Sequence, residues 1–342
     1  MQNTFQSFLL TGSLGLAILG AGTTAMIQTD FAAAERSLVG GSYQREIEGR
    51  FEQSLPLRQL SVHAWNALKF GLLGQPNTGA YLGQSGYLFT TEELKAPAPG
   101  YAFEAEVAAA KLHLDGLGIR LVPVIVPDKA RIYSSDLPFN RSAALNQRYP
   151  GSLERLVQMD LPAIDLASGL TRLNSRVQTF MKTDTHWSPA GARFAASAIA
   201  THLADVELER SEFSTTKGLN EQFQGDLARF AETGPFRDYL GPERETITRY
   251  ETRSLAPADD LFGDIEVPVA LVGTSFSDRR EFHFEGFLKQ STGLDLINFA
   301  QSGRGPFKPM REFLASEALK NSPPKIVIWE IPERYISPKD LS

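Results

Sequence analysis

Short apolar runs alternate with longer amphipathic stretches from about residue 100 onward. The run IRLVPVIVP at 119–127 is rich in branched residues, which is typical of a strand buried on both faces of a sheet. Upstream, AYLGQSGYLF predicts two short strands joined by a glycine turn. Similar apolar runs predict further strands at 162–166, 267–273, 294–300 and 325–331.

Helical patterns separate these predicted strands. The spacing of apolar residues predicts helices at 100–118, at 142–158, from Pro189 onward, at about 279–291 and at about 307–320. Strands that alternate with helices imply right-handed crossovers and a mostly parallel sheet covered on both faces. The predicted fold is therefore a three-layer α/β/α domain, and ligands in such a fold bind outside the carboxyl ends of the strands.

The pattern divides the chain into three parts. Residues 8–27 carry no charged side chain, and this length suits a hydrocarbon core of about 30 Å. Residues 1–30 are therefore predicted to be a signal peptide or a retained signal anchor, the anchor being favoured because no A-x-A site follows; a buried helix of a cytosolic domain is the alternative. Residues 31–75 predict helices, and 76–342 form the α/β domain with an irregular polar excursion at about 205–262.

Composition narrows the classes of protein. Hydrophobic residues make up 42% of the chain and charged residues 22%, as in ordinary globular proteins. The net charge of −6 argues against general nucleic-acid binding, which needs basic surface to neutralise phosphates. The chain has no cysteine, so disulfides, cysteine-ligated metals and a cysteine nucleophile are excluded.

A histidine and an aspartate stand together before the helix that begins at Pro189. Asp184 and His186 flank one residue, so in an extended segment their side chains point the same way. A carboxylate bonded to one ring nitrogen fixes the tautomer and leaves the other nitrogen as a base. Ser188 is expected to cap the helix, with Pro189 at its first position. The alternative is a structural histidine bonded to a nearby backbone carbonyl.

A candidate nucleophile follows the predicted strand at 267–273. In ALVGTSFSDRR, a serine after Gly273 projects from a tight turn at the top of the sheet, where its backbone N–H stabilises developing negative charge. Ser275 is the preferred nucleophile and Ser277 the second choice. Either serine would otherwise serve only as a helix cap.

Two further strand ends carry candidate binding residues. In NFAQSGRGPF at 298–307, Gly303 and Gly305 permit close approach of a ligand, and Gly303 is the second candidate oxyanion donor beside Ser275. Arg304 and Trp187 are the candidate substrate-binding residues; a flexible turn with a solvated arginine is the alternative for Arg304. The last strand leads into WEIPERY, which either lines a sugar-binding surface with Trp329, Glu330, Arg334 and Tyr335 or closes the sheet.

The other four histidines are weaker candidates. His113 and His202 lie within predicted helices, and His63 lies in the amino-terminal helical region. His283 is expected about 12 Å along the helix that follows Ser275, too far to activate that serine. One suitable histidine with scattered carboxylates does not make a zinc site, so neither a metal nor another cofactor is expected.

These motifs resemble a known family. GQSGYLF, VPVIVPDKARIY, TDTHWSPAGA, LVGTSFS and WEIPERY occur in this order in the AlgJ/AlgX family of alginate O-acetyltransferases, and the resemblance covers about residues 45–337. It implies an SGNH hydrolase-like domain in which Asp184, His186 and Ser275 form the catalytic triad. It also implies a membrane-tethered protein in the periplasm. There a membrane-bound O-acyltransferase would relay the acetyl group, and other exopolysaccharide secretion subunits would be partners.

Three functions follow from these features. The first is an O-acetyltransferase that moves an acetyl group through Ser275 onto hydroxyls of a secreted polysaccharide, with no nucleic-acid partner. The second is an acetyl esterase that uses the same residues with water as the acceptor. The third is a non-catalytic scaffold of a polysaccharide secretion complex. The amino-terminal segment is expected to tether the protein to the inner membrane.

Overall fold

The computed structural model describes residues 19–31, 41–56, 58–96, 102–255 and 267–337. The chain separates into two compact units, of which the smaller comprises Met1–Gly74 and Ala231–Gly241 and the larger the remainder. Most of the hydrophobic segment expected at 8–27 lies outside the described residues, and its described part belongs to a helix at 19–28. Within the described ranges, no helix is both long enough and apolar enough to cross a bilayer.

The smaller unit is helical. Its longest helix buries Asn66, Ala67 and Phe70. Gly71 on this helix is in close contact with Leu240, because an added Cβ would lie 2.6 Å from the leucine Cδ2 atom. The described elements of this unit are α2 (Ser42–Ser54), α3 (Arg58–Leu73), η4 (Gly234–Phe236) and α9 (Arg237–Leu240).

The larger unit is built on a four-stranded parallel sheet in the order β3-β8-β6-β7. Ile328 in β8 pairs with Val122 on one side and with Leu271 on the other. The sequence-based prediction of a central parallel sheet is therefore confirmed. The strands are β3 (Arg120–Val126), β6 (Val269–Val272), β7 (Leu296–Asn298) and β8 (Ile326–Pro332).

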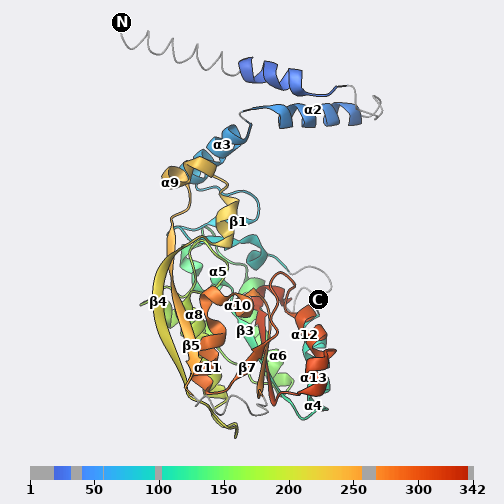
Figure 1. Ribbon diagram of the computed structural model, residues 1–342, viewed down its shortest axis with the longest axis vertical. Coiled ribbons are helices and arrows are strands. Elements are labelled where there is room, and N and C mark those ends of the chain that lie inside the picture. The colour runs from blue at the N-terminus through green and yellow to red at the C-terminus, as the bar shows by residue number, and fades with distance from the viewer. Residues whose placement is uncertain (1–18, 32–40, 57, 97–101, 256–266, 338–342) are drawn as a thin grey trace. The chain divides into compact units, whose positions relative to one another are not determined.

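Helices cover both faces of this sheet (Figure 1). Val122 and Val124 face one hydrophobic core and Leu121 and Ile125 the other, as the pleat of a strand requires. The first core is completed by α5 (Lys129–Ile132), α7 (Leu166–Asn174), α8 (Pro189–His202) and α11 (Phe284–Thr292). The second is completed by α4 (Phe103–Asp115), α6 (Ala143–Gln158), α12 (Phe307–Leu314) and α13 (Glu317–Asn321).

Short elements connect these layers. A hairpin formed by β1 (Ala80–Leu82) and β2 (Leu88–Thr90) confirms the predicted strand–turn–strand. The remaining short helices are η1 (Thr91–Leu94), η2 (Ser134–Asp136), η3 (Asp226–Phe230), α10 (Ser275–Asp278), η6 (Arg280–Phe282) and η7 (Glu333–Tyr335).

Three local predictions were wrong. Residues 162–166 do not form a strand, because the Asp165 carboxylate accepts a hydrogen bond from the Ser168 N–H and begins α7. The helix predicted at 279–291 is interrupted at His283, whose φ of 60° is left-handed. The helix predicted at 307–320 is split because the Ser316 hydroxyl caps a new helix by accepting from the Leu319 N–H.

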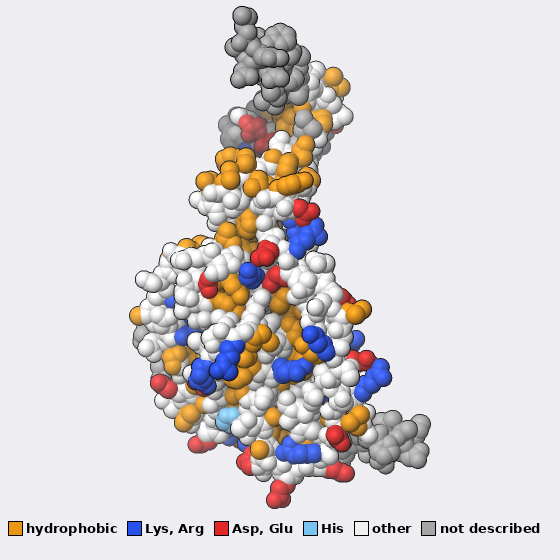
Figure 2. Space-filling view, turned by 90° about the vertical axis from the view of Figure 1, so that its left-hand side faces the viewer, with side chains coloured by type: hydrophobic (Ala, Val, Ile, Leu, Met, Phe, Trp, Pro, Cys, Tyr) orange, Lys and Arg blue, Asp and Glu red, His pale blue; other side chains and the backbone are white. Residues whose placement is uncertain are grey.

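The excursion expected to be irregular contains an ordered antiparallel ribbon. It consists of β4 (Phe213–Phe223) and β5 (Glu245–Ser254), with an irregularity between Lys217 and Asn220. Tyr250 of β5 packs on Phe287 of α11, at 5.1 Å between ring centroids. Figure 2 faces the side of the molecule on which this ribbon lies, and it shows basic side chains distributed among apolar ones. The ribbon is therefore part of the packed domain.

Candidate active site

The loop that carries Ser275 is fixed by a buried glutamate on the neighbouring strand. Thr274 follows β6 and Gly273, and Ser275 is the first residue of α10. The Thr274 N–H donates to the Glu330 carboxylate at 2.7 Å, and the Thr274 hydroxyl donates to it at 3.0 Å. A Cβ at Gly273 would lie 2.5 Å from a Glu330 carboxylate oxygen, so only glycine allows this approach.

Glu330 is fully buried and does not form a sugar-binding surface. Burial raises the pKa of Glu330 to about 7, and hydrogen bonds from Thr274 and Ser277 only partly oppose that effect. Trp329 is also fully buried, and its indole N–H donates to the Pro306 carbonyl at 3.0 Å. For these two residues, the structure supports the alternative that the last strand closes the sheet.

The raised pKa of Glu330 gives stability a defined pH dependence. Between pH 4.5 and about 7, the folded chain retains a proton at this group that the unfolded chain has lost. The free energy of unfolding should therefore fall by about 2–3 kcal/mol as the pH rises through this window. In urea unfolding at several pH values, Glu330→Gln should remove this component, whereas Glu317→Gln on the surface should leave it. Equal pH slopes in wild type and Glu330→Gln would contradict the assignment.

The loop before α8 brings His186 to Ser275. Phe180 and Trp187 form an isolated antiparallel bridge that closes this loop, and the Ser188 hydroxyl caps α8 as predicted. The His186 Nε2 atom lies 2.7 Å from the Ser275 hydroxyl oxygen. The loop follows a helix instead of the strand that was predicted at 162–166, but it still reaches the carboxyl edge of the sheet.

Asp184 orients the imidazole. Its Oδ1 atom lies 2.5 Å from His186 Nδ1 and accepts the His186 backbone N–H at 2.9 Å. Because the carboxylate accepts at Nδ1, the Nε2 atom is left unprotonated and can accept the Ser275 hydroxyl proton. The ring of His186 stacks on Phe282, at 5.2 Å between centroids and 23° between planes.

The charge of Asp184 is stabilised although the residue is fully buried. Its Oδ2 atom accepts from Arg279 Nη1 at 3.1 Å and from the Asp226 backbone N–H at 2.9 Å. Burial alone would raise the pKa of Asp184, but the hydrogen bond and charge of His186, together with Arg279, hold it well below its usual range. Asp184 is therefore ionised at neutral pH.

Two distant residues hold the backbone of this loop. The buried Lys129 ammonium donates to the carbonyls of Met181, Lys182 and Asp184, at 2.6 Å for Asp184. Burial lowers the pKa of Lys129 to about 8 despite nearby acids. Glu245 of β5 accepts from the Lys182 N–H at 2.7 Å. Sequence reasoning did not identify Lys129, Glu245 or Arg279 because their roles depend on contacts between distant segments.

One group of acids could be considered for a metal. Asp184, His186 and Asp226 place one ligand atom each within 4.8 Å of one another. However, both Asp184 oxygens already accept N–H donors, including the Arg279 guanidinium, and an Asp226 oxygen accepts the Thr185 N–H at 2.8 Å. A cation would compete with the arginine, so the donor set fits acid–base chemistry better than metal binding.

Other expected site residues have different surroundings. Trp187 is fully buried against Phe276 and Phe284, which corrects its assignment as a substrate-binding residue. Ser277 is buried and its hydroxyl donates to Glu330 at 3.2 Å, so the second choice of nucleophile does not face His186. Both assignments failed because the direction of each side chain is set by core packing.

The loop after β7 lies beside the nucleophile loop. The Gln301 N–H donates to the Gly273 carbonyl at 3.1 Å, and the Ser302 hydroxyl donates to Asp278 of α10 at 2.5 Å. Gly303 has a φ of 75° and open space around its Cα, as the predicted close approach of a ligand requires. Arg304 forms a partly exposed ion pair with Glu312 at 3.1 Å.

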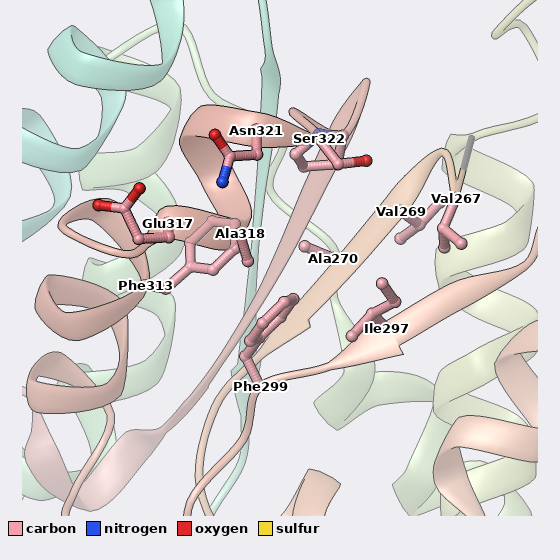
Figure 3. A pocket seen from close by; sticks show the side chains of 11 residues that line it. Val267, Val269, Ala270, Ile297, Phe299, Phe313, Glu317, Ala318, Asn321 and Ser322 are labelled. Atoms are coloured by element: carbon pink, nitrogen blue, oxygen red, sulfur yellow. The ribbon is translucent and has the colours of Figure 1, made fainter. Parts of the chain in front are cut away.

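The remaining histidines have other environments. His283 Nε2 lies 2.7 Å from the Thr252 hydroxyl of β5, and its pKa is lowered by burial. His113 and His202 are exposed in the last turns of α4 and α8. In the smaller unit, His63 packs against Gly234. A separate cavity of about 190 Å³ lies between β6, the edge strand β7 and α13 and is lined mainly by apolar residues (Figure 3).

The three-layer fold, with a serine, a histidine and an aspartate in contact at the carboxyl edge of its sheet, defines an SGNH hydrolase-like protein. Residues 80–333 match the family model described as the SGNH hydrolase-like domain of acetyltransferase AlgX. The chain therefore belongs to the AlgJ/AlgX family of SGNH hydrolase-like acetyltransferases, and the resemblance seen in its motifs is confirmed.

Individual relatives agree with this membership. Over 89% of this chain and 82% of the relative, it is 36% identical to the probable alginate O-acetylase AlgJ of Pseudomonas aeruginosa. The O-acetyltransferase domain of Pseudomonas putida AlgJ superimposes with a TM-score of 0.69 at 33% identity, over 75% of this chain and 92% of that domain. Pseudomonas aeruginosa AlgX superimposes with a TM-score of 0.60 at 25% identity, over 74% of this chain and 61% of that structure.

Proposed function

We propose that this protein transfers acetyl groups to hydroxyls of a secreted polysaccharide through an acetyl ester of Ser275. The observation that carries the proposal is the continuous contact from Asp184 through His186 to Ser275, at 2.5 and 2.7 Å. A serine activated by an oriented imidazole is the arrangement that acyl transfer requires. Membership of an acetyltransferase family and similarity to alginate O-acetylases support acetyl as the group and a polysaccharide as the acceptor.

The reaction has two proton transfers at His186. In the first half, Nε2 takes the Ser275 hydroxyl proton while the oxygen attacks the donor's acetyl carbonyl, and the proton then passes to the leaving group. In the second half, Nε2 takes the proton of a sugar hydroxyl as that oxygen attacks the acetyl ester. The same proton then returns to Ser275 as the acetylated sugar leaves.

Oxyanion stabilisation is assigned to two backbone N–H groups. The Ser275 N–H has no acceptor among the described residues and belongs to the nucleophile itself. Gly303 lies in the loop that Gln301 and Ser302 attach to the nucleophile turn. Each donor would contribute about 3 kcal/mol to stabilising the tetrahedral intermediate. Arg304, in the same loop, is proposed to contact the glycan after exchanging Glu312 for a substrate oxygen.

The proposal extends to the location and the acetyl donor. The family resemblance supports an extracytoplasmic, periplasmic protein that residues 1–30 direct to, or retain at, the inner membrane. Within an alginate-type machinery, a membrane-bound O-acyltransferase would supply the acetyl group and other secretion subunits would present the polysaccharide.

A two-step assay tests this function. The protein is incubated with a chromogenic acetyl ester, and mass spectrometry should detect one acetyl group on Ser275. Added alginate oligosaccharide should then become O-acetylated, and correspondingly less free acetate should be released. Release of acetate alone would show an acetyl esterase, and an unmodified Ser275 would show a non-catalytic scaffold.

A further inference from the structure

Two aromatic side chains are exposed on the larger unit, and they are in contact with each other. Tyr81 lies in β1 and Phe139 in the loop after η2, and their exposed fractions are 39% and 40%. Their rings form a T-shaped pair, with 5.0 Å between centroids and 79° between planes. Every other Phe, Tyr and Trp side chain in the described part of this unit is buried or half-buried. Exposed apolar groups that gather at one place often mark a binding surface.

The two segments that carry this aromatic pair are held together. Phe89, which pairs with Tyr81 across the hairpin, is buried in the first core. The Gln84 N–H in the hairpin turn donates to the Asp136 carbonyl at 2.8 Å. A Cβ at Gly83 would lie 2.6 Å from that same carbonyl oxygen, so only glycine allows the close approach. The hairpin and the loop after η2 therefore present the two rings from one ordered surface.

Both segments are also bonded to the catalytic loop, residues 179–188. The Leu88 N–H of β2 donates to the Lys182 carbonyl at 2.8 Å. Tyr133, which lies between α5 and η2, accepts the Thr179 N–H at its hydroxyl oxygen, at 3.0 Å. The segment from α5 to the loop after η2 follows the carboxyl end of β3, and ligands of this fold bind where the strands end. The aromatic pair therefore belongs to the same edge of the sheet as the nucleophile.

The size and polarity of this surface fit a sugar ring. The C–H face of a pyranose is apolar and packs on an aromatic ring, while its hydroxyl groups bond to polar side chains at the margin. Gln84 of the hairpin turn and Asn140, which directly follows Phe139, are exposed polar residues of these two segments. An interface with a folded protein would cover about 800 Å² on each partner, far more than two partly exposed rings supply.

We propose that Tyr81 and Phe139 form a subsite that binds a sugar ring of the acceptor at a distance from the reacting hydroxyl. This inference rests on the proposed acetyltransferase function and locates part of its acceptor-binding surface. Contact with a remote ring would hold the polysaccharide beside Ser275 and so favour attack on the acetyl ester. An acceptor too short to reach both Ser275 and the aromatic pair would gain nothing from this subsite.

The length of the acceptor provides the test. Wild type, Tyr81→Ala, Phe139→Ala and Phe139→Tyr are compared with a chromogenic acetyl ester alone, with added alginate disaccharide and with added long alginate oligosaccharide. Each alanine variant should raise the KM for the long oligosaccharide by roughly 10-fold. The KM for the disaccharide and the acetylation of Ser275 by the ester should change less than about twofold. Phe139→Tyr keeps an aromatic ring and should match wild type. Leu112→Ala, which removes an exposed apolar side chain of α4, is the matched control.

Each other outcome overturns the inference. Equal effects on the two acceptors, or slower acetylation of Ser275, would show that the pair only supports the catalytic loop. An unchanged KM for the long oligosaccharide in both alanine variants would show that the rings do not bind the acceptor. Should Tyr81→Ala unfold, Phe139→Ala decides, because its side chain lies in a loop and outside the strand pairing.

A wild type that transfers acetyl to neither acceptor would contradict the proposed function but would leave the subsite testable. Calorimetric titration of the long oligosaccharide into wild type and Phe139→Ala then measures the subsite without the reaction. Tighter binding to wild type, by roughly 10-fold, is the expected result. Equal affinities, or no binding to wild type, would overturn the assignment of Tyr81 and Phe139.

Discussion

Replacement of Ser275 by alanine should abolish acetyl transfer while leaving the protein folded. The Ser275 hydroxyl oxygen lies 2.7 Å from His186 Nε2, and alanine removes this group, which carries the acetyl ester. We expect the rate of acetylation from a chromogenic ester to fall by at least about 10⁴-fold. The melting temperature should stay close to that of wild type, because the hydroxyl has no other bonded partner among the described residues.

Ser277→Ala is the matched control for this prediction. Ser277 lies two residues further along the same short helix, and its hydroxyl donates to Glu330. Its replacement should cost about 1 kcal/mol of stability and leave most of the activity. Substantial turnover in Ser275→Ala, or a complete loss in Ser277→Ala with Ser275 still reactive, would show that the nucleophile is assigned wrongly.

Replacement of Asp184 by asparagine should slow acetylation of Ser275 by about 10³- to 10⁴-fold. An amide that bonds to Arg279 through its oxygen presents its NH₂ group to His186 Nδ1. That ring nitrogen must then accept, which places the proton on Nε2 and prevents His186 from taking the Ser275 proton. The KM for the ester should change little, because Asp184 is fully buried and does not contact the substrate.

The same variant should also be less stable. Arg279 would retain Glu281, with which it forms two hydrogen bonds, but would lose its charged partner Asp184. We expect a loss of about 1–3 kcal/mol in urea unfolding. Asp165→Asn, which preserves the cap of α7 and lies outside the contacts of Asp184, should match wild type in both assays. Near-normal acetylation by Asp184→Asn would exclude a role for the carboxylate in selecting the tautomer.

Local patterns predicted much of the fold and the contacting trio of side chains. Branched apolar runs identified β3, β6 and β8, because a strand buried on both faces must be apolar throughout, and the run predicted at 294–300 contained the half-exposed edge strand β7. The Asp-x-His spacing and the turn after Gly273 identified Asp184, His186 and Ser275. These features can be predicted from the sequence because they depend on residues that are neighbours in the chain.

Features that depend on distant contacts were not predictable. Glu245 lies in a polar stretch that resembles a loop, yet β5 pairs along almost all of β4. Nothing in the local sequence shows that Lys129 reaches three carbonyls some fifty residues away. Trp187 was a candidate substrate-binding residue, but the alternation of side chains in that segment directs it into the core.

The attachment of the Asp184 loop to β5 has a consequence for engineering and for damage to the protein. Glu245 accepts hydrogen bonds from Lys182 and Thr183, so the ribbon braces the residues directly before Asp184. Shortening the ribbon, or nicking it with a protease, would spare the pairing of the parallel strands and the second core, but it would loosen Phe223 and Ile247 in the first core and release the imidazole from alignment. Such a molecule would keep its parallel sheet but lose activity, and measurements that report only on the sheet would not detect the change.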